Sequence, residues 1–144
     1  MKYLTMRMYR GEEDYWRIRA FLREVLVCND GRQRSWDVAR FDYWRWHGIA
    51  NLWIVDLKEY VCIWETEDGQ IAAVLNPEGE GDAFFQIHPR LREPGLEECM
   101  LDQAEQRLAG PRGDNGRRRL TVWANEHEKE LNAAFEQRGY VPGD

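Results

Sequence analysis

The chain has 144 residues, and 20 lysine and arginine residues against 26 aspartate and glutamate residues give a formal net charge of −6. This length fits one domain over residues 1–144, which can bury a core without disulfides or a structural metal. The acidic balance argues against nucleic acid as a partner, and no apolar tract is long enough to cross a bilayer, so we expect no membrane partner.

Cysteine and histidine usage points to a reduced compartment and to no metal site. The cysteines are odd in number, far apart and without a CxxC spacing: Cys28, Cys62 and Cys99. The histidines follow no metal-ligand spacing: His47, His88 and His127. Since the N-terminal residues also lack the apolar stretch of a signal peptide, we expect a cytoplasmic protein.

The first third of the chain predicts a short strand and two helices. Residues 3–9 alternate as a strand does, and Arg10-Gly11 ends the pattern. From Glu12 the apolar residues recur at helical spacing, until residues 29–31 (Asn-Asp-Gly) end the helix. Ser35 is expected to cap a second helix that ends at Gly48.

The rest of the chain predicts strands followed by alternating helices and strands. The strand-like segments of the middle are residues 52–55, 60–66, 70–75 and 83–88. Asp68-Gly69 predicts a hairpin turn, and Pro89 ends the last of these strands because proline has no N–H to donate. A helix over residues 96–108, a strand over 119–124 and a helix ending at Gly139 follow.

This order of elements predicts the topology of the sheet. Passing from the 83–88 strand through a helix to the 119–124 strand requires a crossover, so these two strands should be parallel neighbours. The other connections are short enough for antiparallel pairing. The expected fold class is therefore α/β, or α+β in some schemes: a mixed, mostly antiparallel sheet flanked by about four helices.

Three segments resemble the GNAT superfamily of acyl-CoA-dependent N-acetyltransferases. Residues 87–96 (IHPRLREPGL) are similar to its strand-loop-helix signature, in which a strand ends in Pro and Arg/Gln-x-x-Gly-x-Gly/Ala opens a helix. Arg92 and Gly95 occupy the first two fixed positions. Residues 6–22 resemble the opening strand and helix of the family, and residues 135–140 resemble its aromatic-x-x-x-Gly-aromatic helix end.

The resemblance implies an N-acetyltransferase that moves the acetyl group of acetyl-CoA to the amine of a small molecule or a peptide. The implied coenzyme-binding residues are Ile87, His88, Arg92, Gly95 and Leu96. A helix N-terminus suits a pyrophosphate because its free N–H groups and dipole favour an anion. A backbone N–H near Ile87 or His88 would polarise the thioester carbonyl.

An incoming amine needs a base, and the gap where the 83–88 and 119–124 strands diverge is where it would act. The candidate catalytic residues are Glu126, His127 and His88. The alternative interpretation is that these are exposed polar residues at strand ends.

Two departures from the family pattern favour a second hypothesis. Glu97 stands where the family has its last small residue, and with Glu93 and Glu98 it makes the loop a poor anion site. Phe135 stands where many members carry a Tyr that protonates the leaving thiolate. The alternative function is therefore a non-catalytic GNAT-fold module, a structural or ligand-sensing half of a larger or dimeric assembly.

The C-terminal end of the sequence gives a third departure. Family domains usually continue past the Gly-aromatic pair with one or two strands, whereas this chain stops four residues after Tyr140. We therefore expect a degenerate or truncated GNAT-like domain, such as one half of a tandem-GNAT protein. The uncovered edge of the 119–124 strand then predicts a homo-oligomer or an adjacent second domain as partner.

Overall fold

The computed structural model describes residues 1–32 and 34–143, and its five strands form one sheet in the order β1-β2-β3-β4-β5. The strands are β1 (Thr5–Met8), β2 (Cys62–Glu65), β3 (Ile71–Asn76), β4 (Asp82–Ile87) and β5 (Thr121–Trp123). The helices are α1 (Glu12–Cys28), α2 (Val38–Tyr43), α3 (Leu96–Arg107) and α4 (Lys129–Gln137), with a π-helix η1 (Trp44–Leu52) and a 3-10 helix η2 (Leu57–Glu59).

The sheet is mixed and mostly antiparallel, as predicted. Strands β1 to β4 pair antiparallel with their neighbours, and β5 pairs parallel with β4. The β2–β3 connection turns at Gly69, whose φ of +86° lies in the left-handed region that glycine tolerates. The predicted hairpin at Asp68-Gly69 is therefore confirmed.

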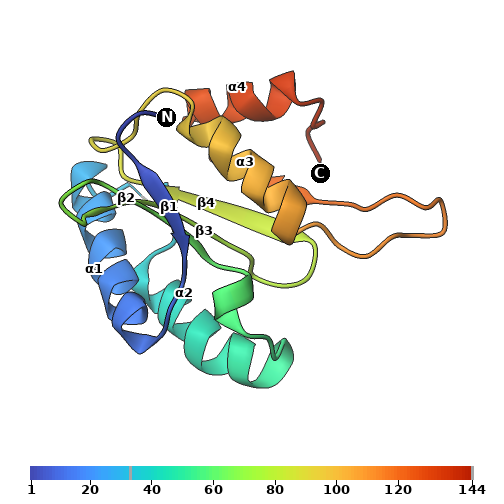
Figure 1. Cartoon of the computed structure of the whole chain (residues 1–144), viewed down its shortest axis with the longest axis horizontal. Helices are drawn as coiled ribbons and strands as arrows, with labels where there is room; N and C mark the ends of the chain where they lie inside the picture. Colours follow the sequence, from blue (N-terminus) through green and yellow to red (C-terminus); the bar gives the residue numbers. More distant parts are fainter. Residues whose placement is uncertain (33, 144) are drawn as a thin grey trace.

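Helices cover both faces of the sheet, with α1 and α2 on one face and α3 and α4 on the other (Figure 1). Because side chains alternate along a strand, each face of the sheet has its own apolar core. The core on the α3 and α4 face includes Leu75, Leu101 and Phe135. The core on the α1 and α2 face includes Ile18 and Val74.

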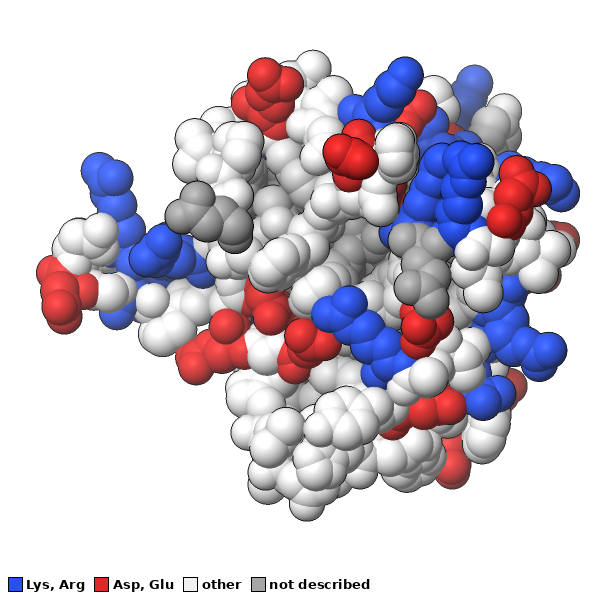
Figure 2. Space-filling view, turned by 180° about the vertical axis from the view of Figure 1, so that it is seen from behind, with Lys and Arg blue, Asp and Glu red and all other residues white. Residues whose placement is uncertain are grey.

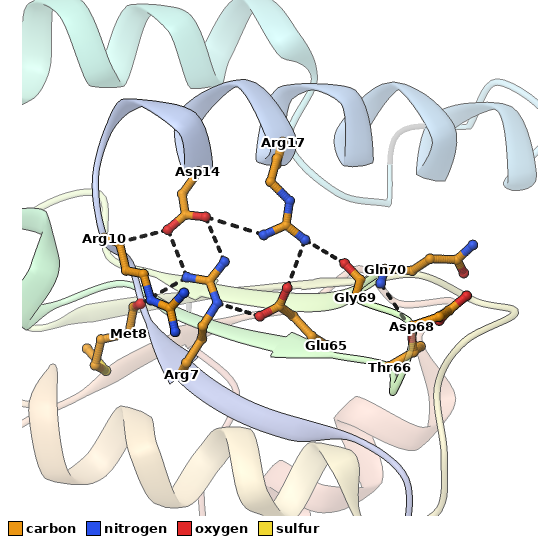
Figure 3. Close-up of polar contacts among 10 residues, drawn as sticks. All are labelled: Arg7, Met8, Arg10, Asp14, Arg17, Glu65, Thr66, Asp68, Gly69 and Gln70. Atoms are coloured by element: carbon orange, nitrogen blue, oxygen red, sulfur yellow. Dashed lines mark hydrogen bonds and ion pairs between the residues drawn. The ribbon is translucent and has the colours of Figure 1, made fainter.

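A network of four charged side chains fastens α1 to the sheet (Figure 3). Arg7 of β1 donates two hydrogen bonds to the buried Asp14 of α1, at 2.7 and 2.8 Å, and a third to Glu65 of β2. Arg17 of α1 binds Glu65 at 2.8 Å and the Gly69 carbonyl oxygen at 2.6 Å. The network fixes the orientation of the helix over the β2–β3 hairpin.

Three predictions in residues 35–55 are wrong. The second helix is capped by Asp37, whose carboxylate accepts the Arg40 N–H at 2.7 Å, and not by Ser35. Gly48 does not end the helical segment, because η1 continues to Leu52.

The predicted strand over 52–55 does not form either. Leu52 closes η1, and the side chains of Leu52 and Ile54 are 71% and 79% exposed, so they join no sheet face. The apolar residues of this segment resemble a strand, but only Trp53 and Val55 pack against the core, and the segment pairs with no strand.

No helix among the described residues combines the length and the apolar character that crossing a membrane requires.

Candidate functional site

Strands β4 and β5 separate before β4 ends, and this opens the sheet. Their pairing covers Asp82 to Phe84 on β4, and the rest of β4 continues without β5 beside it. The His88 N–H donates to the Ala72 carbonyl oxygen at 2.9 Å on the β3 side. Because amides alternate in direction along a strand, the Ile87 N–H points into the gap on the β5 side. The β4–β5 register ends at Phe84 and Trp123, so β5 does not pair with Ile87.

Two cavities flank this gap. The α3-side cavity is lined by Ile87, Pro89, Arg92, Glu97, His127 and Glu128, among others. The α2-side cavity is lined by Arg34, Trp36, Arg40, Phe84, Trp123 and Glu128, among others. Arg34 and Glu128 belong to both linings, so the two cavities meet at these side chains. The face of the molecule in Figure 2 is hollowed near its middle, and both basic and acidic side chains lie around the hollow.

Glu128 is held at the junction of the two cavities by the turn that leads from β5 into α4. Its Oε2 accepts the Asn125 N–H at 2.8 Å, and its own N–H donates to the Asn125 carbonyl oxygen at 3.0 Å. Burial raises the pKa of the Glu128 carboxyl to about 7, although the Asn125 N–H and the charge of Arg34 oppose the rise. A carboxyl that titrates near neutral pH can accept and release a proton during a reaction.

The loop before α3 has the backbone of an anion-binding site. Gly95 caps the helix with a φ of +89°, and a Cβ at this position would meet no atom within 4 Å. The buried Leu96 anchors the first turn in the core. The loop is therefore open on its outer side, next to the helix start, where the Leu96 N–H already donates to the Glu93 carbonyl oxygen at 3.2 Å.

Arg92 is bound by a neighbouring carboxylate. Its Nε donates to Oε1 of the buried Glu97 at 3.1 Å, and its Nη2 donates to the same oxygen. Glu93 points elsewhere, since it accepts the N–H groups of Lys2 and Leu4 at 2.9 and 3.2 Å. Of the two, Glu97 is therefore the acidic side chain that lines the α3-side cavity.

The comparisons with known proteins rest on structure. No protein-family model matches the sequence, and the search of curated proteins gives no match. A GCN5-related N-acetyltransferase from Sphaerobacter thermophilus superposes with a TM-score of 0.63 at 19% identity, over 99% of this chain and 44% of that one. A candidate phosphinothricin N-acetyltransferase superposes with a TM-score of 0.61 at 17% identity, over 98% of this chain and 85% of that one.

The chain has the GCN5-related N-acetyltransferase (GNAT) fold. It spans less than half the length of the Sphaerobacter chain, and most of the length of the second neighbour. The predicted fold class is confirmed.

Within this GNAT fold, His88 faces away from the gap. It is buried, with its ring 6.4 Å from that of Phe21 on α1. Its Nδ1 accepts the Arg90 N–H at 3.1 Å, so the proton of the neutral ring is on Nε2, 3.4 Å from Glu24. The backbone N–H of His88 donates to β3 within the sheet. Of the two backbone N–H groups expected to polarise a carbonyl, the one of Ile87 is therefore the one that points into the gap.

Glu126 and His127 lie in the turn between β5 and α4, where both are exposed. They lie 3.5 Å from each other, and the His127 side chain reaches the rim of the α3-side cavity. Glu128, which we did not predict as a base, is the more enclosed carboxylate of this turn. Its place at the start of a helix after a strand is visible in the sequence, but its burial is not.

Phe135 and Tyr140 supply no proton to the gap. Phe135 is buried against Phe85 with ring centroids 5.2 Å apart, and the Tyr140 hydroxyl donates to Glu105 at 3.0 Å. The part of the chain that the structure describes also contains no cluster of three or more His, Cys, Asp or Glu side chains suited to a metal ion.

Proposed function

We propose that this GNAT-fold chain transfers an acetyl group from acetyl-CoA to an amine in the gap between β4 and β5. The observation that carries the proposal is Glu128, a carboxyl with a pKa of about 7 on the wall that the two cavities share. The Ile87 N–H points into the same gap. Acyl transfer to an amine requires a base that takes the proton of the amine and a hydrogen-bond donor to the developing oxyanion, and both groups face this gap.

The backbone of the loop before α3 suits the pyrophosphate of the coenzyme, whereas the charges of its side chains suit it only in part. The open Gly95 turn, the first N–H groups of α3 and Arg92 would hold the pyrophosphate. A thioester bound there supplies an activated acyl carbonyl. Glu97 opposes this binding, because it takes up the charge of Arg92 and adds its own.

Each residue at the gap then has its own role in the reaction. The Ile87 N–H would donate to the oxygen on which charge develops, and Glu128 would accept the proton that the amine loses. Since Phe135 has no proton to give, the leaving thiolate must be protonated by water.

The test is acetyl transfer to a panel of amines, measured as thiol release over a range of pH. We expect kcat/KM to rise with pH through an apparent pKa of about 7, the pH at which Glu128 becomes a base. Glu128→Gln should lower kcat by roughly 10²–10⁴-fold, the usual contribution of a general base. Glu136→Gln, at an exposed position of α4 outside both cavities, is the control and should keep full activity. Equal rates in the two variants would remove Glu128 from the mechanism.

A second candidate function is a non-catalytic GNAT-fold module, and the ion pair of Arg92 with the buried Glu97 favours it. If that pair serves only the fold, acetyl-CoA will bind neither the natural chain nor the Glu97→Ala variant. If the loop is a coenzyme site weakened by Glu97, the variant should bind acetyl-CoA at least tenfold more tightly. Calorimetric titration of both proteins separates these functions, with Glu98→Ala on the exposed side of the same turn as control.

A further inference from the structure

Two buried N–H donors on the wall of the α2-side cavity lack a partner. Within the described part of the chain, neither Nε1 of Trp36 nor Nε of Arg34 has a hydrogen-bond acceptor. Trp36 is only 5% exposed, and both side chains line the cavity. Buried donors are nearly always paired in folded proteins, so two unpaired donors from one short segment point to a ligand with acceptor atoms.

Trp36 is held in place by its other polar contacts. Its backbone N–H donates to Gln86 Oε1 at 2.8 Å, and Gln86 in turn donates to Asn76 Oδ1 at 3.2 Å. The Arg40 guanidinium lies 4.6 Å from the centre of the Trp36 ring. The backbone hydrogen bond to Gln86 and the Arg40 guanidinium over one ring face therefore hold the indole in place. Its N–H cannot turn toward another acceptor.

The charges around the cavity select an anion of low charge. Arg40 is already paired with Glu78, at 2.9 Å, outside the cavity. Arg34 is the cation of the lining that reaches Glu128, whose carboxylate makes a doubly charged phosphate unfavourable. A single carboxylate suits a guanidinium and an indole N–H, because it offers two acceptor oxygens.

The rest of the lining is aromatic. The rings of Phe84 and Trp123 are stacked, 5.9 Å apart and 4° from parallel, and Phe84 also contacts Trp36 at 5.1 Å. These ring faces offer apolar contact to a ligand side chain. Glu128 also belongs to this lining, and its carboxylate would favour an ammonium group.

We propose that the α2-side cavity binds the carboxylate of an acceptor that carries both an amine and a carboxylate, as amino acids do. The carboxylate would lie against Arg34 and Trp36, the amine toward Glu128, and an apolar side chain against Phe84 and Trp123. The role of the amine rests on the proposed function, whereas the carboxylate site does not.

The test is a titration of the protein with three small molecules of similar shape, in which NMR follows the indole N–H signals of the tryptophans. L-Phenylalanine carries both groups, phenylacetate only the carboxylate and phenethylamine only the amine. We expect phenylalanine and phenylacetate to shift the Trp36 Nε1–H signal, and phenethylamine to leave it in place. Arg34→Gln and Trp36→Phe, which keeps an aromatic ring, should weaken phenylalanine binding at least tenfold, while Arg112→Gln on the distant loop should not.

The outcomes separate this inference from the acetyl-transfer proposal. If the carboxylates bind but no amine is acetylated, the carboxylate site stands and the proposed function fails. If phenethylamine is acetylated as well as phenylalanine and Arg34→Gln changes neither rate, the proposed function stands and the inference is wrong. An unchanged Trp36 signal with all three probes also overturns the inference.

Discussion

Glu128 is the residue at which the stability of the fold and the proposed chemistry oppose each other. Burial raises the pKa of its carboxyl to about 7, so the folded chain holds this proton more tightly than the unfolded chain does. The sign follows from linkage: stability from this group is greatest at acidic pH and is lost as pH rises through the folded pKa.

Replacing Glu128 should therefore stabilise the protein at alkaline pH. We expect Glu128→Gln to raise the melting temperature at pH 8 by roughly 2–8 °C, the shift that about 1 kcal/mol gives in domains of this size. At pH 4, where the natural carboxyl is protonated, the two proteins should melt together. Calorimetric melting at both pH values measures this, with Glu126→Gln as the matched control. A destabilised variant at pH 8 would show that the carboxylate is structurally required.

The features of the candidate site that are set by the backbone could be predicted from the sequence. The features that are set by the burial of side chains could not. The end of β4 at Ile87, one residue before the predicted end at His88, follows from Pro89, and the turn at Gly95 follows from the glycine itself. The inward turn of Glu97 and the raised pKa of Glu128 come from packing against distant segments. No local pattern of residues reports which carboxylate a fold will enclose.

At the scale of elements, α1 is fastened by charge as well as by its apolar face. Burial alone would raise the pKa of the Asp14 carboxyl, but hydrogen bonds from Arg7 and the Arg10 N–H hold the pKa below its usual value. Asp14 therefore stabilises the fold at neutral pH, and this stabilisation is lost as pH falls through its lowered pKa. Figure 3 shows why: its carboxylate lies between Arg7 and Arg17.

Breaking this network should cost more than any exposed ion pair. We expect Asp14→Asn to lower the unfolding free energy at pH 7 by about 1–3 kcal/mol, because Arg7 would lose its charged hydrogen bonds to Asp14 and keep only Glu65 as a carboxylate partner. The loss should shrink as pH falls well below 4, where the natural carboxyl is protonated too. Urea unfolding at pH 7 and at pH 2–3 measures both effects.

Glu13→Gln is the control for this network, since Glu13 is an exposed acid in the same first turn of α1. It should change the unfolding free energy by less than about 1 kcal/mol. A cost for Asp14→Asn no larger than for this control would show that the network adds nothing to stability.

Among the elements, those with strong local signals were predictable and those set by packing were not. The α1 boundaries follow from an acidic first turn and a glycine-containing end. The π-helix η1 has no such signal, because Gly48 has an ordinary backbone there and the segment carries Trp44 into the core. Of the apolar residues of 52–55, Leu52 and Ile54 are exposed while Trp53 and Val55 pack against the core, although periodicity alone would place the segment in a strand.

At the scale of the whole molecule, β5 is an edge strand with an apolar surface. It is last in the sheet order, and Trp123 is 53% exposed. The Thr121 N–H donates to the Gly81 carbonyl oxygen at 2.9 Å on the β4 side, so the Val122 N–H and C=O point outward. Such an edge can add a strand from another chain, and we propose a second copy of this chain as its partner.

The last prediction is that this edge mediates self-association, and Val122→Pro is the variant that tests it. Proline removes the outward N–H and keeps the inward bonds of Thr121 and Trp123 with β4. In light scattering over a series of concentrations, the natural chain should approach twice its monomer mass and the variant should remain monomeric. Val27→Lys, which removes an exposed apolar residue from α1, should behave like the natural chain. Because pairing through β5 needs the outward N–H, a natural chain that stays monomeric at high concentration, or a dimer that persists in Val122→Pro, contradicts the prediction.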